Sequence, residues 1–197
     1  MRSNLTDVTF SPDGRLVLTA TDDTEVKMWS AMKGKCLMTF VGHASRVATA
    51  VFNSDGKLAL TASDDATAKI WSTTKKIRGT MKGICLRTFV GHDDVLNGAI
   101  FSSDAALVLT ASMDFTAKVW NSSSGACMRT FAGHTHWVSA AIFSFDSKSV
   151  ITASHDHTCK VWSLATEECT LTLAGHADAV MSVCQAPTKA ATGSDPF

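Results

Sequence analysis

The chain has 197 residues, of which 45% are hydrophobic and 8% aromatic, enough for one large or two small domains with a packed core. This composition excludes a disordered chain. Its 18 basic and 18 acidic residues cancel, so no broad positive field favours nucleic acid or an anionic membrane as a partner.

Targeting signals and cysteines indicate the compartment. No apolar run approaches the ~20 residues that cross a bilayer, and the first residues, MRSNLTDVTF, lack the apolar segment of a signal peptide. We therefore expect an intracellular protein, cytoplasmic or nuclear. The six cysteines form no CxxC pair, and four of them recur at one place in the repeat: Cys36, Cys85, Cys127 and Cys169. We therefore predict that all six are reduced thiols packed as small apolar side chains.

A unit of 42 residues repeats along the chain. The histidines of four Gly-His pairs, His43, His92, His134 and His176, are spaced by 49, 42 and 42 residues. Four tryptophans, Trp29, Trp71, Trp120 and Trp162, are spaced by 42, 49 and 42. Each series has one long interval because the distance from Trp71 to Cys85 is 14 residues, whereas the same distance is 7 in the other units. Seven residues are therefore inserted within 72–83.

Each unit contains four short segments rich in Val, Ile, Thr, Phe and Trp, which predict β-strands. In the second unit they are VATAVFN, KLALTAS, TAKIWS and ICLRTFV. Turn residues agree, as in Ser11-Pro12-Asp13-Gly14. In chain order the units cover residues 5–41, 42–90, 91–132 and 133–174, and residues 175–197 begin a fifth. A small four-stranded sheet cannot bury both faces alone, so we expect successive sheets to stack.

The repeated motif resembles that of the WD-repeat (WD40, β-transducin-like) family. It consists of GH followed by LTAS-x-Asp-x-Thr-x-Lys-x-Trp, as in Leu60 to Trp71 and Leu109 to Trp120, with altered forms at Leu18 to Trp29 and Ile151 to Trp162. The resemblance implies an all-β, partial β-propeller with four complete blades and part of a fifth, in a single domain over residues 1–197. The Asp of the Trp-Asp pair is missing, and Met1 stands where the first unit would have its His. The positions after the tryptophans hold Ser30, Ser72, Asn121 and Ser163.

The resemblance also implies a structural tetrad in each blade. An indole N–H, a hydroxyl, an imidazole and a carboxylate can satisfy one another in series. The expected members are His43, Thr61, Asp65, Trp71; His92, Thr110, Asp114, Trp120; His134, Thr152, Asp156, Trp162; and Thr19, Asp23, Trp29 in the first unit. Thr, His and Asp in series also look like a nucleophile, a base and an orienting acid. Equivalent copies in three units favour structure over catalysis, so we predict no catalytic residue and no enzyme.

Family members bind partners on the rim formed by the GH loops and the Asp turns. Carried over, that predicted rim comprises Asp22, Arg46, Asp64, Val95, Asn97, Met113, Trp137, Ser139 and His155. Trp137 is the one Trp outside the repeat position, and with Arg46 it is our expected anchor, because Trp and Arg dominate interface energetics. The alternative is that Trp137 packs between blades.

Two further features have competing interpretations. The fourth unit holds His134, His136, His155 and His157, a conceivable metal site, but His134 belongs to the expected tetrad, so we predict no metal and no cofactor. The insertion carries four cations, Lys75, Lys76, Arg78 and Lys82. We expect it to be a solvated loop on the opposite rim, with a contact to an acidic partner or RNA as the alternative.

The number of units predicts an open arc with two uncovered apolar faces. A seven-bladed ring, common in the family, needs about 300 residues. A fragment of a longer protein, self-association into a larger ring, and a contracted closed ring all explain the shortfall.

The sequence therefore predicts a non-catalytic scaffold that presents its rim to partner proteins. A substrate-recognition or sensor module of a larger regulatory protein, such as a ligase subunit or a signalling NTPase, is one alternative. A metal-dependent propeller that uses the His-rich turn is another.

Overall fold

The computed structural model describes residues 4–184, which form four four-stranded antiparallel sheets. The first two contain β1 (Leu5–Phe10), β2 (Leu16–Thr21), β3 (Glu25–Ser30), β4 (Cys36–Val41), and β5 (Val47–Phe52), β6 (Leu58–Ser63), β7 (Ala68–Lys76), β8 (Gly83–Phe89). The next two contain β9 (Leu96–Phe101), β10 (Leu107–Ser112), β11 (Thr116–Asn121), β12 (Cys127–Ala132), and β13 (Val138–Phe143), β14 (Ser149–Ser154), β15 (Thr158–Ser163), β16 (Cys169–Ala174). The predicted all-β fold is confirmed, and we call these sheets blades 1 to 4.

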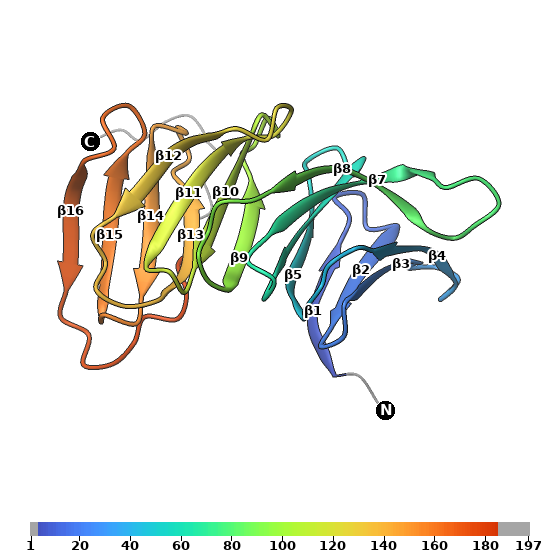
Figure 1. The fold of residues 1–197 in the computed structure, drawn as a ribbon, viewed down its shortest axis with the longest axis horizontal. Helices are drawn as coiled ribbons and strands as arrows, with labels where there is room; N and C mark the ends of the chain where they lie inside the picture. Colours follow the sequence, from blue (N-terminus) through green and yellow to red (C-terminus); the bar gives the residue numbers. More distant parts are fainter. Residues whose placement is uncertain (1–3, 185–197) are drawn as a thin grey trace, which may run out of the picture.

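Within each blade, neighbouring strands are consecutive in the chain, so every connection is a short hairpin. Thr61 of β6, for example, lies opposite Ala50 of β5 and Lys69 of β7. In Figure 1 the four sheets follow one another in an arc, with blade 1 at one end and blade 4 at the other. Among residues 4–184 the sheets do not close into a ring.

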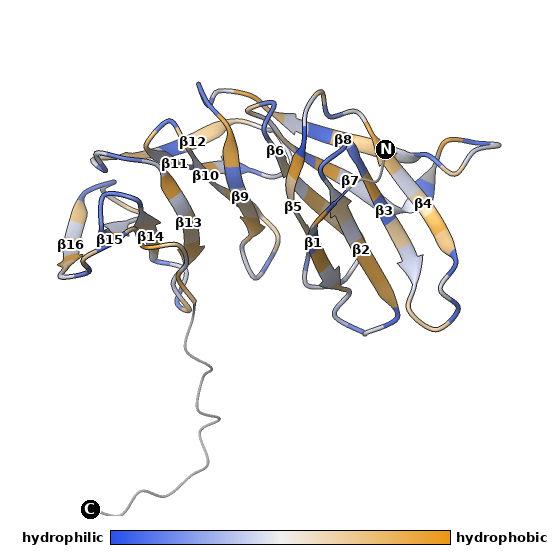
Figure 2. Cartoon of the chain, turned by 90° about the horizontal axis from the view of Figure 1, so that it is seen from below, coloured by the Kyte–Doolittle hydropathy of each residue, from blue (hydrophilic) through white to orange (hydrophobic). Residues whose placement is uncertain are grey.

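The core consists of three apolar clusters, each formed by two successive blades. Leu18, Met28 and Phe40 of blade 1 pack with Val47 and Trp71 of blade 2. Equivalent clusters join blade 2 to blade 3 around Phe89 and Trp120, and blade 3 to blade 4 around Phe131 and Trp162. In Figure 2 most of the apolar colour lies on the strands, although β3, β8 and β9 also carry hydrophilic segments. Stacking therefore buries the sheet faces that a single blade would leave in water.

The antiparallel order gives every blade two different edges. The GH loops and the β2–β3, β6–β7, β10–β11 and β14–β15 turns lie at one edge, which we call the GH edge. The remaining hairpin turns lie at the other, which we call the far edge. The tetrad His and Asp residues and the predicted rim therefore belong to the GH edge, whereas each tetrad Trp lies near the far-edge end of its strand. The insertion belongs to the far edge.

The sequence predicted a solvated loop on the opposite rim, and residues 74, 75 and 77–82 are indeed exposed at the far edge, but the inserted residues also take strand structure. They lengthen β7 and β8 into a hairpin extension, residues 72–83, which we call the arm (Figure 1). The amide of Thr39 in β4 donates a 2.8 Å hydrogen bond to the carbonyl of Met81, and Thr39 and Lys82 form a parallel bridge. A Cβ on Gly83 would lie 2.4 Å from Phe40, so this close approach requires glycine. The arm is thus docked on blade 1.

The cysteines also differ in part from expectation. All six are free thiols, but Cys85, Cys127 and Cys169 are exposed and therefore do not pack in the core. They lie on the outermost strands, where the sequence pattern does not reveal which face a neighbour covers. Cys159 is buried and Cys36 is half-buried.

The two ends of the arc expose apolar side chains. Leu5, Val8 and Phe10 of β1 and Leu171 and Leu173 of β16 are about half exposed or more. Residues 175–184 contain no strand, and the rest of the predicted fifth unit, residues 185–197, lies outside the described residues. Within residues 4–184 there is no helix long and apolar enough to cross a membrane.

Candidate functional site

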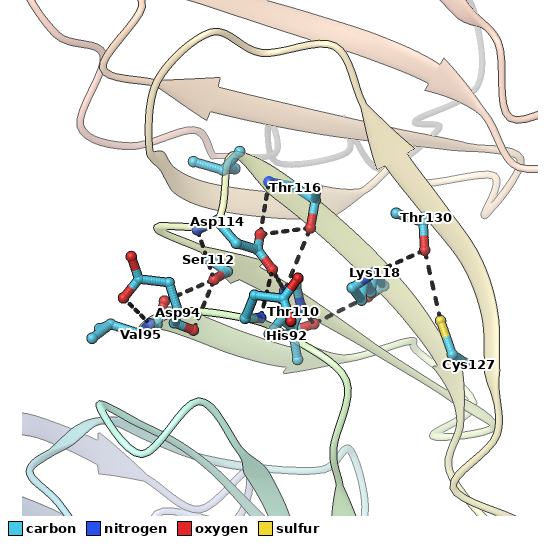
Figure 3. Close-up of polar contacts among 12 residues, drawn as sticks. His92, Asp94, Val95, Thr110, Ser112, Asp114, Thr116, Lys118, Cys127 and Thr130 are labelled. Carbon is cyan, nitrogen blue, oxygen red and sulfur yellow. Dashed lines mark hydrogen bonds and ion pairs between the residues drawn. The ribbon is translucent and has the colours of Figure 1, made fainter.

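In blades 2, 3 and 4 the structure brings the four predicted tetrad residues together. In blade 3, Trp120 Nε1 lies 2.9 Å from Thr110 Oγ1, which lies 2.7 Å from His92 Nε2. His92 Nδ1 lies 2.6 Å from Asp114 Oδ2. Figure 3 shows the last three residues and their contacts. The same three distances are 2.9, 2.7 and 2.8 Å in blade 2, and 2.9, 2.7 and 2.6 Å in blade 4.

The order of donors in the tetrad follows from chemistry. A carboxylate only accepts hydrogen bonds, so the histidine Nδ1 carries the proton and Nε2 accepts from the Thr hydroxyl, which itself accepts from the indole N–H. Burial lowers the pKa of His43 and of His134, which favours the neutral ring. Burial alone would raise the pKa of Asp65, but hydrogen bonds from Thr67, the Ala44 amide and His43 outweigh it and lower the pKa to about 2.

Each complete tetrad has a fifth member that sequence reasoning missed. Thr67 donates a 2.6 Å hydrogen bond to the second carboxylate oxygen of Asp65, and Thr116 and Thr158 do the same for Asp114 and Asp156. The signal was present, because the repeated motif contains Thr two residues after the Asp. All the strong acceptor sites of the carboxylate are therefore used inside the blade.

Blade 1 lacks this arrangement. Trp29 Nε1 donates to Thr19 Oγ1 at 2.8 Å, but Met1, the residue at the His position, lies outside the described residues. Glu25 replaces the second Thr, and the hydroxyl of Thr21 binds Asp23 at 2.6 Å instead.

The buried hydroxyls of the tetrads have no access to a substrate. Thr61, Thr110 and Thr152 are 0%, 1% and 0% exposed, and each already contacts the indole and the imidazole. A nucleophile needs a free approach and an oxyanion site. The geometry therefore suits a structural role better than catalysis.

Four predicted rim residues lie apart from the others, in blades 1 and 2 and at the start of blade 3. Asp22 accepts hydrogen bonds from the amide and the side chain of Asn4, both at 2.9 Å. Arg46 Nη1 lies 3.6 Å from Asp64 Oδ1, an ion pair between an exposed and a half-buried side chain. Val95 is half-buried. These four residues lie at the GH edge, and none of them lines the depression beside Trp137.

The other five predicted rim residues come together between blades 3 and 4. One open depression of about 350 Å³ is lined by Asn97, Met113, Trp137, Ser139, His155 and Met181. Asn97 and Ser139 donate to the carbonyls of Val138 and Val180, so each ties its own segment to the next unit. Met181 was missed by sequence reasoning, although it lies five residues after His176, as Asn97 and Ser139 lie five residues after His92 and His134.

Trp137 belongs to a cluster of aromatic rings beside this depression. Its ring centroid lies 4.9 Å from that of His136 and 5.3 Å from that of His155, and the two imidazoles stack at 5.5 Å with an interplanar angle of 17°. Phe115 extends the cluster, 5.9 Å from His136. Trp137 is 38% exposed and Phe115 41%, so neither is enclosed between blades. We call Phe115, His136, Trp137 and His155 the aromatic rim cluster.

Phe115 was not predicted as a rim residue, and its backbone is unusual. Its φ of 71° lies in the left-handed region, which is costly for a bulky side chain. Ala66 and His157 occupy the equivalent turn positions with φ of 62° and 70°. The turn therefore imposes the backbone, while nothing in the fold requires an aromatic side chain there.

The histidines of blade 4 do not gather around one point. Both ring nitrogens of His134 are used in its tetrad, and His136 Nδ1 accepts the amide of Trp137 at 2.8 Å. Among residues 4–184 no group of three or more His, Cys, Asp or Glu side chains is placed to hold a metal ion.

Comparison with known proteins agrees with the repeat. The sequence profile described as "WD domain, G-beta repeat" matches residues 2–30, 34–72, 83–121 and 125–163, well over half of the chain. A 40-residue stretch is 48% identical to part of "Periodic tryptophan protein 2" from Arabidopsis thaliana. That match covers 20% of this chain and 4% of the relative.

Proposed function

This chain belongs to the WD40 repeat family, and from that premise we propose that it is a protein-interaction module that holds a partner at the depression beside Trp137. The observation that carries the proposal is the placement of five of the nine predicted rim residues around that single depression. Aromatic and Met side chains around a concave site are typical of interface anchors.

Internal comparison supports a binding role for the aromatic rim cluster. The position of Trp137 holds Arg46 and Val95 in the other units, and that of Phe115 holds Ala66 and His157. Because the same fold forms with these other side chains, the exposed rings are not needed for folding. Exposed aromatic side chains that the fold does not require are a common mark of an interface.

We further propose that the module has no chemistry of its own, as is usual in this family. Each Thr-His-Asp series is buried and fully hydrogen-bonded, in three equivalent copies. A role as the recognition part of a larger regulatory protein is compatible with the same surface. The division of one domain into units 5–41, 42–90, 91–132 and 133–174, with an intracellular location, is part of this proposal.

The test compares two exposed aromatic residues. The tagged wild-type chain, Trp137→Ala and Phe145→Ala are used to capture proteins from a cell extract, and bound proteins are quantified by mass spectrometry. Phe145 is 75% exposed in the turn between β13 and β14 at the far edge, which makes it a matched control. We expect partners that Phe145→Ala retains and Trp137→Ala loses. Equal recovery by all three proteins would remove the basis of the proposal.

Two alternative hypotheses, metal binding and self-association, are tested separately. For the metal hypothesis, zinc titration of the wild type and of a His155→Ala, His157→Ala double variant should give no difference if the module is a scaffold. Self-association through the exposed side chains of β1 and β16 stays a prediction, and the molar mass in solution, measured by light scattering over a range of concentrations, tests it.

A further inference from the structure

The far edge has an uneven distribution of charge that the proposed rim function does not explain. No carboxylate occurs between Val26 and Val47 or between Ala66 and His92, although the whole chain has as many acidic as basic residues. The cations of these stretches include Lys33 and Lys35, in the β3–β4 turn of blade 1, and the charged residues of the arm.

The equivalent turns of the other blades provide an internal control. The outer turn of blade 3, residues 122–126, has no charged residue, and that of blade 4 has two carboxylates, Glu167 and Glu168. The same hairpin therefore forms with basic, neutral or acidic residues. Neither the charge nor the seven added residues of the arm are required by the fold of a blade.

Five cations of the β3–β4 turn and the arm are exposed and unpaired. Lys33, Lys35, Lys75, Arg78 and Lys82 are all exposed, and within residues 4–184 no carboxylate lies within ion-pair distance of any of them. By contrast, Lys57, in the β5–β6 turn of the same far edge, lies 3.1 Å from Asp55. We call the five unpaired residues the basic edge.

The arm holds its part of the basic edge in a fixed place. Besides the bond between Thr39 and Met81, the amide of Ile77 donates to the carbonyl of Lys82 at 2.8 Å, and the amide of Thr80 donates to the carbonyl of Ile77 at 3.0 Å. The glycine contact with Phe40 anchors the base of the arm. An ordered surface loses less conformational entropy on binding than a free loop would.

Apolar side chains lie among these cations. Met32 is 88% exposed, Ile77 50% and Met81 42%. We propose that the basic edge binds an acidic polypeptide segment that also carries apolar side chains, at a site separate from the GH edge. Carboxylates of the segment face the lysines and arginine, and its apolar side chains cover Met32 and Ile77.

Two other anionic partners fit less well. Single-stranded RNA is bound by aromatic stacking as well as by cations, and neither residues 30–36 nor the arm contains an aromatic residue. A flat anionic membrane would meet the whole far edge, where the inner turns present Asp13, Asp55, Asp104 and Asp146. A narrow peptide avoids those carboxylates.

Direct binding tests this proposal with a fluorescent synthetic peptide in which pairs of glutamates alternate with single leucines. The edge variant combines Lys75→Ser, Arg78→Ser and Lys82→Ser, and the control variant combines Arg15→Ser, Lys57→Ser and Lys148→Ser. The control removes the same charge from exposed positions of the same far edge. In fluorescence anisotropy, we expect about tenfold weaker binding by the edge variant and a change within about twofold in the control.

A second pair of measurements tests the apolar part. Ile77→Ser should weaken binding of the glutamate-leucine peptide about threefold and leave a peptide of glutamates and serines unchanged. All substituted side chains are exposed, so thermal midpoints should match the wild type. Absence of binding by the wild type, equal binding by the edge and control variants, or tighter binding of oligouridylate or of phosphatidylserine vesicles than of the peptide would overturn the proposal. None of these outcomes depends on Trp137.

Discussion

Blade 1 and blades 2 to 4 share one strand pattern but differ in how their tryptophans are covered. Trp71, Trp120 and Trp162 are 1 to 3% exposed, whereas Trp29 is half-buried. Each covered Trp contacts a Phe at the end of the preceding blade and a His at the start of its own, as Trp71 contacts Phe40 at 5.6 Å and His43 at 6.2 Å between ring centroids. The structure describes no such partners for Trp29.

The comparison shows what the Gly-His pair does in this fold. Phe40, Gly42 and His43 belong to one short segment that leaves blade 1 and enters blade 2. Gly42 has a φ of 154°, and a Cβ there would lie 3.2 Å from the Trp71 ring. The segment therefore covers one tryptophan from several directions at once. The tetrad joins each blade to its predecessor as well as completing its own hydrogen bonds.

The largest expected difference between blade 1 and the other blades is in the free energy of unfolding that is lost when the Trp is removed. Trp120→Ala should lower the free energy of unfolding by about 3 to 5 kcal/mol, because it removes a fully buried ring and leaves a cavity. Trp29→Ala should cost about 2 kcal/mol, since its ring is partly in water already. Urea denaturation followed by far-UV circular dichroism measures both. Equal losses would show that the preceding blade does not determine the contribution of the Trp.

The next effect concerns the hydroxyl at the centre of the tetrad. Thr110→Val keeps the shape but leaves the Trp120 N–H and the His92 Nε2 without a partner in a buried site, which should cost about 1 to 3 kcal/mol. Thr19→Val is the matched control in blade 1, where water can reach Trp29, and it should cost less than about 1 kcal/mol. The midpoints of urea unfolding give the comparison, and a larger loss for Thr19→Val would contradict it.

The sequence predicted the parts of this architecture that each repeat determines by itself. The tetrads implied by the family resemblance pair each His with an Asp 22 residues later, and in the structure these pairs lie 2.6 to 2.8 Å apart. The four strands per unit followed from composition and turn residues. These features depend on short-range patterns that recur, so each copy supports the interpretation of the others.

Features that depend on contacts between blades could not be predicted in this way. The arm docks because Gly83 allows β8 to approach Phe40 of another blade, and nothing in the local sequence identifies that neighbour. Met181, by contrast, could have been predicted, because it lies five residues after His176 as Ser139 lies five residues after His134. The exposed cysteines were predicted wrongly to be packed. They lie on the outermost strand of each blade, and the alternation of side chains along that strand does not show which of its faces a neighbour covers.

Acid should weaken the complete tetrads selectively. The lowered pKa values of His43 and of Asp65 mean that the folded chain binds fewer protons than the unfolded chain. Their contribution is present above the unfolded values, about 6.5 and about 3.9, and is lost as the pH falls through the folded ones. The thermal midpoint should therefore fall between about pH 6.5 and 5 and again below about pH 4.

A histidine variant isolates the first of these two steps. The substitution His43→Gln leaves the residues of blade 1 unchanged. The thermal midpoint of this variant should be lower at neutral pH, and it should depend less on pH between about 6.5 and 5 than the midpoint of the wild type. Scanning calorimetry at a series of pH values measures both slopes. The same dependence on pH in variant and wild type would assign the effect to other groups.

The smallest expected effect is on the reactivity of cysteines and not on stability. It shows what covers the outer strand of blade 1. Cys36 on β4 is half-buried, whereas Cys127 on β12 is exposed, and β4 has the arm bound to it at Thr39. Ellman's reagent should therefore modify Cys127 at least about threefold faster than Cys36. Cys159 should react only after unfolding, because it is buried and burial raises the pKa of its thiol.

Removing residues 74–80, which gives the hairpin the length found in the other blades, should raise the rate of Cys36 to that of Cys127 and leave Cys127 unaffected. A Cys36 rate unchanged by this deletion would mean that blade 1 itself, and not the docked arm, protects the thiol.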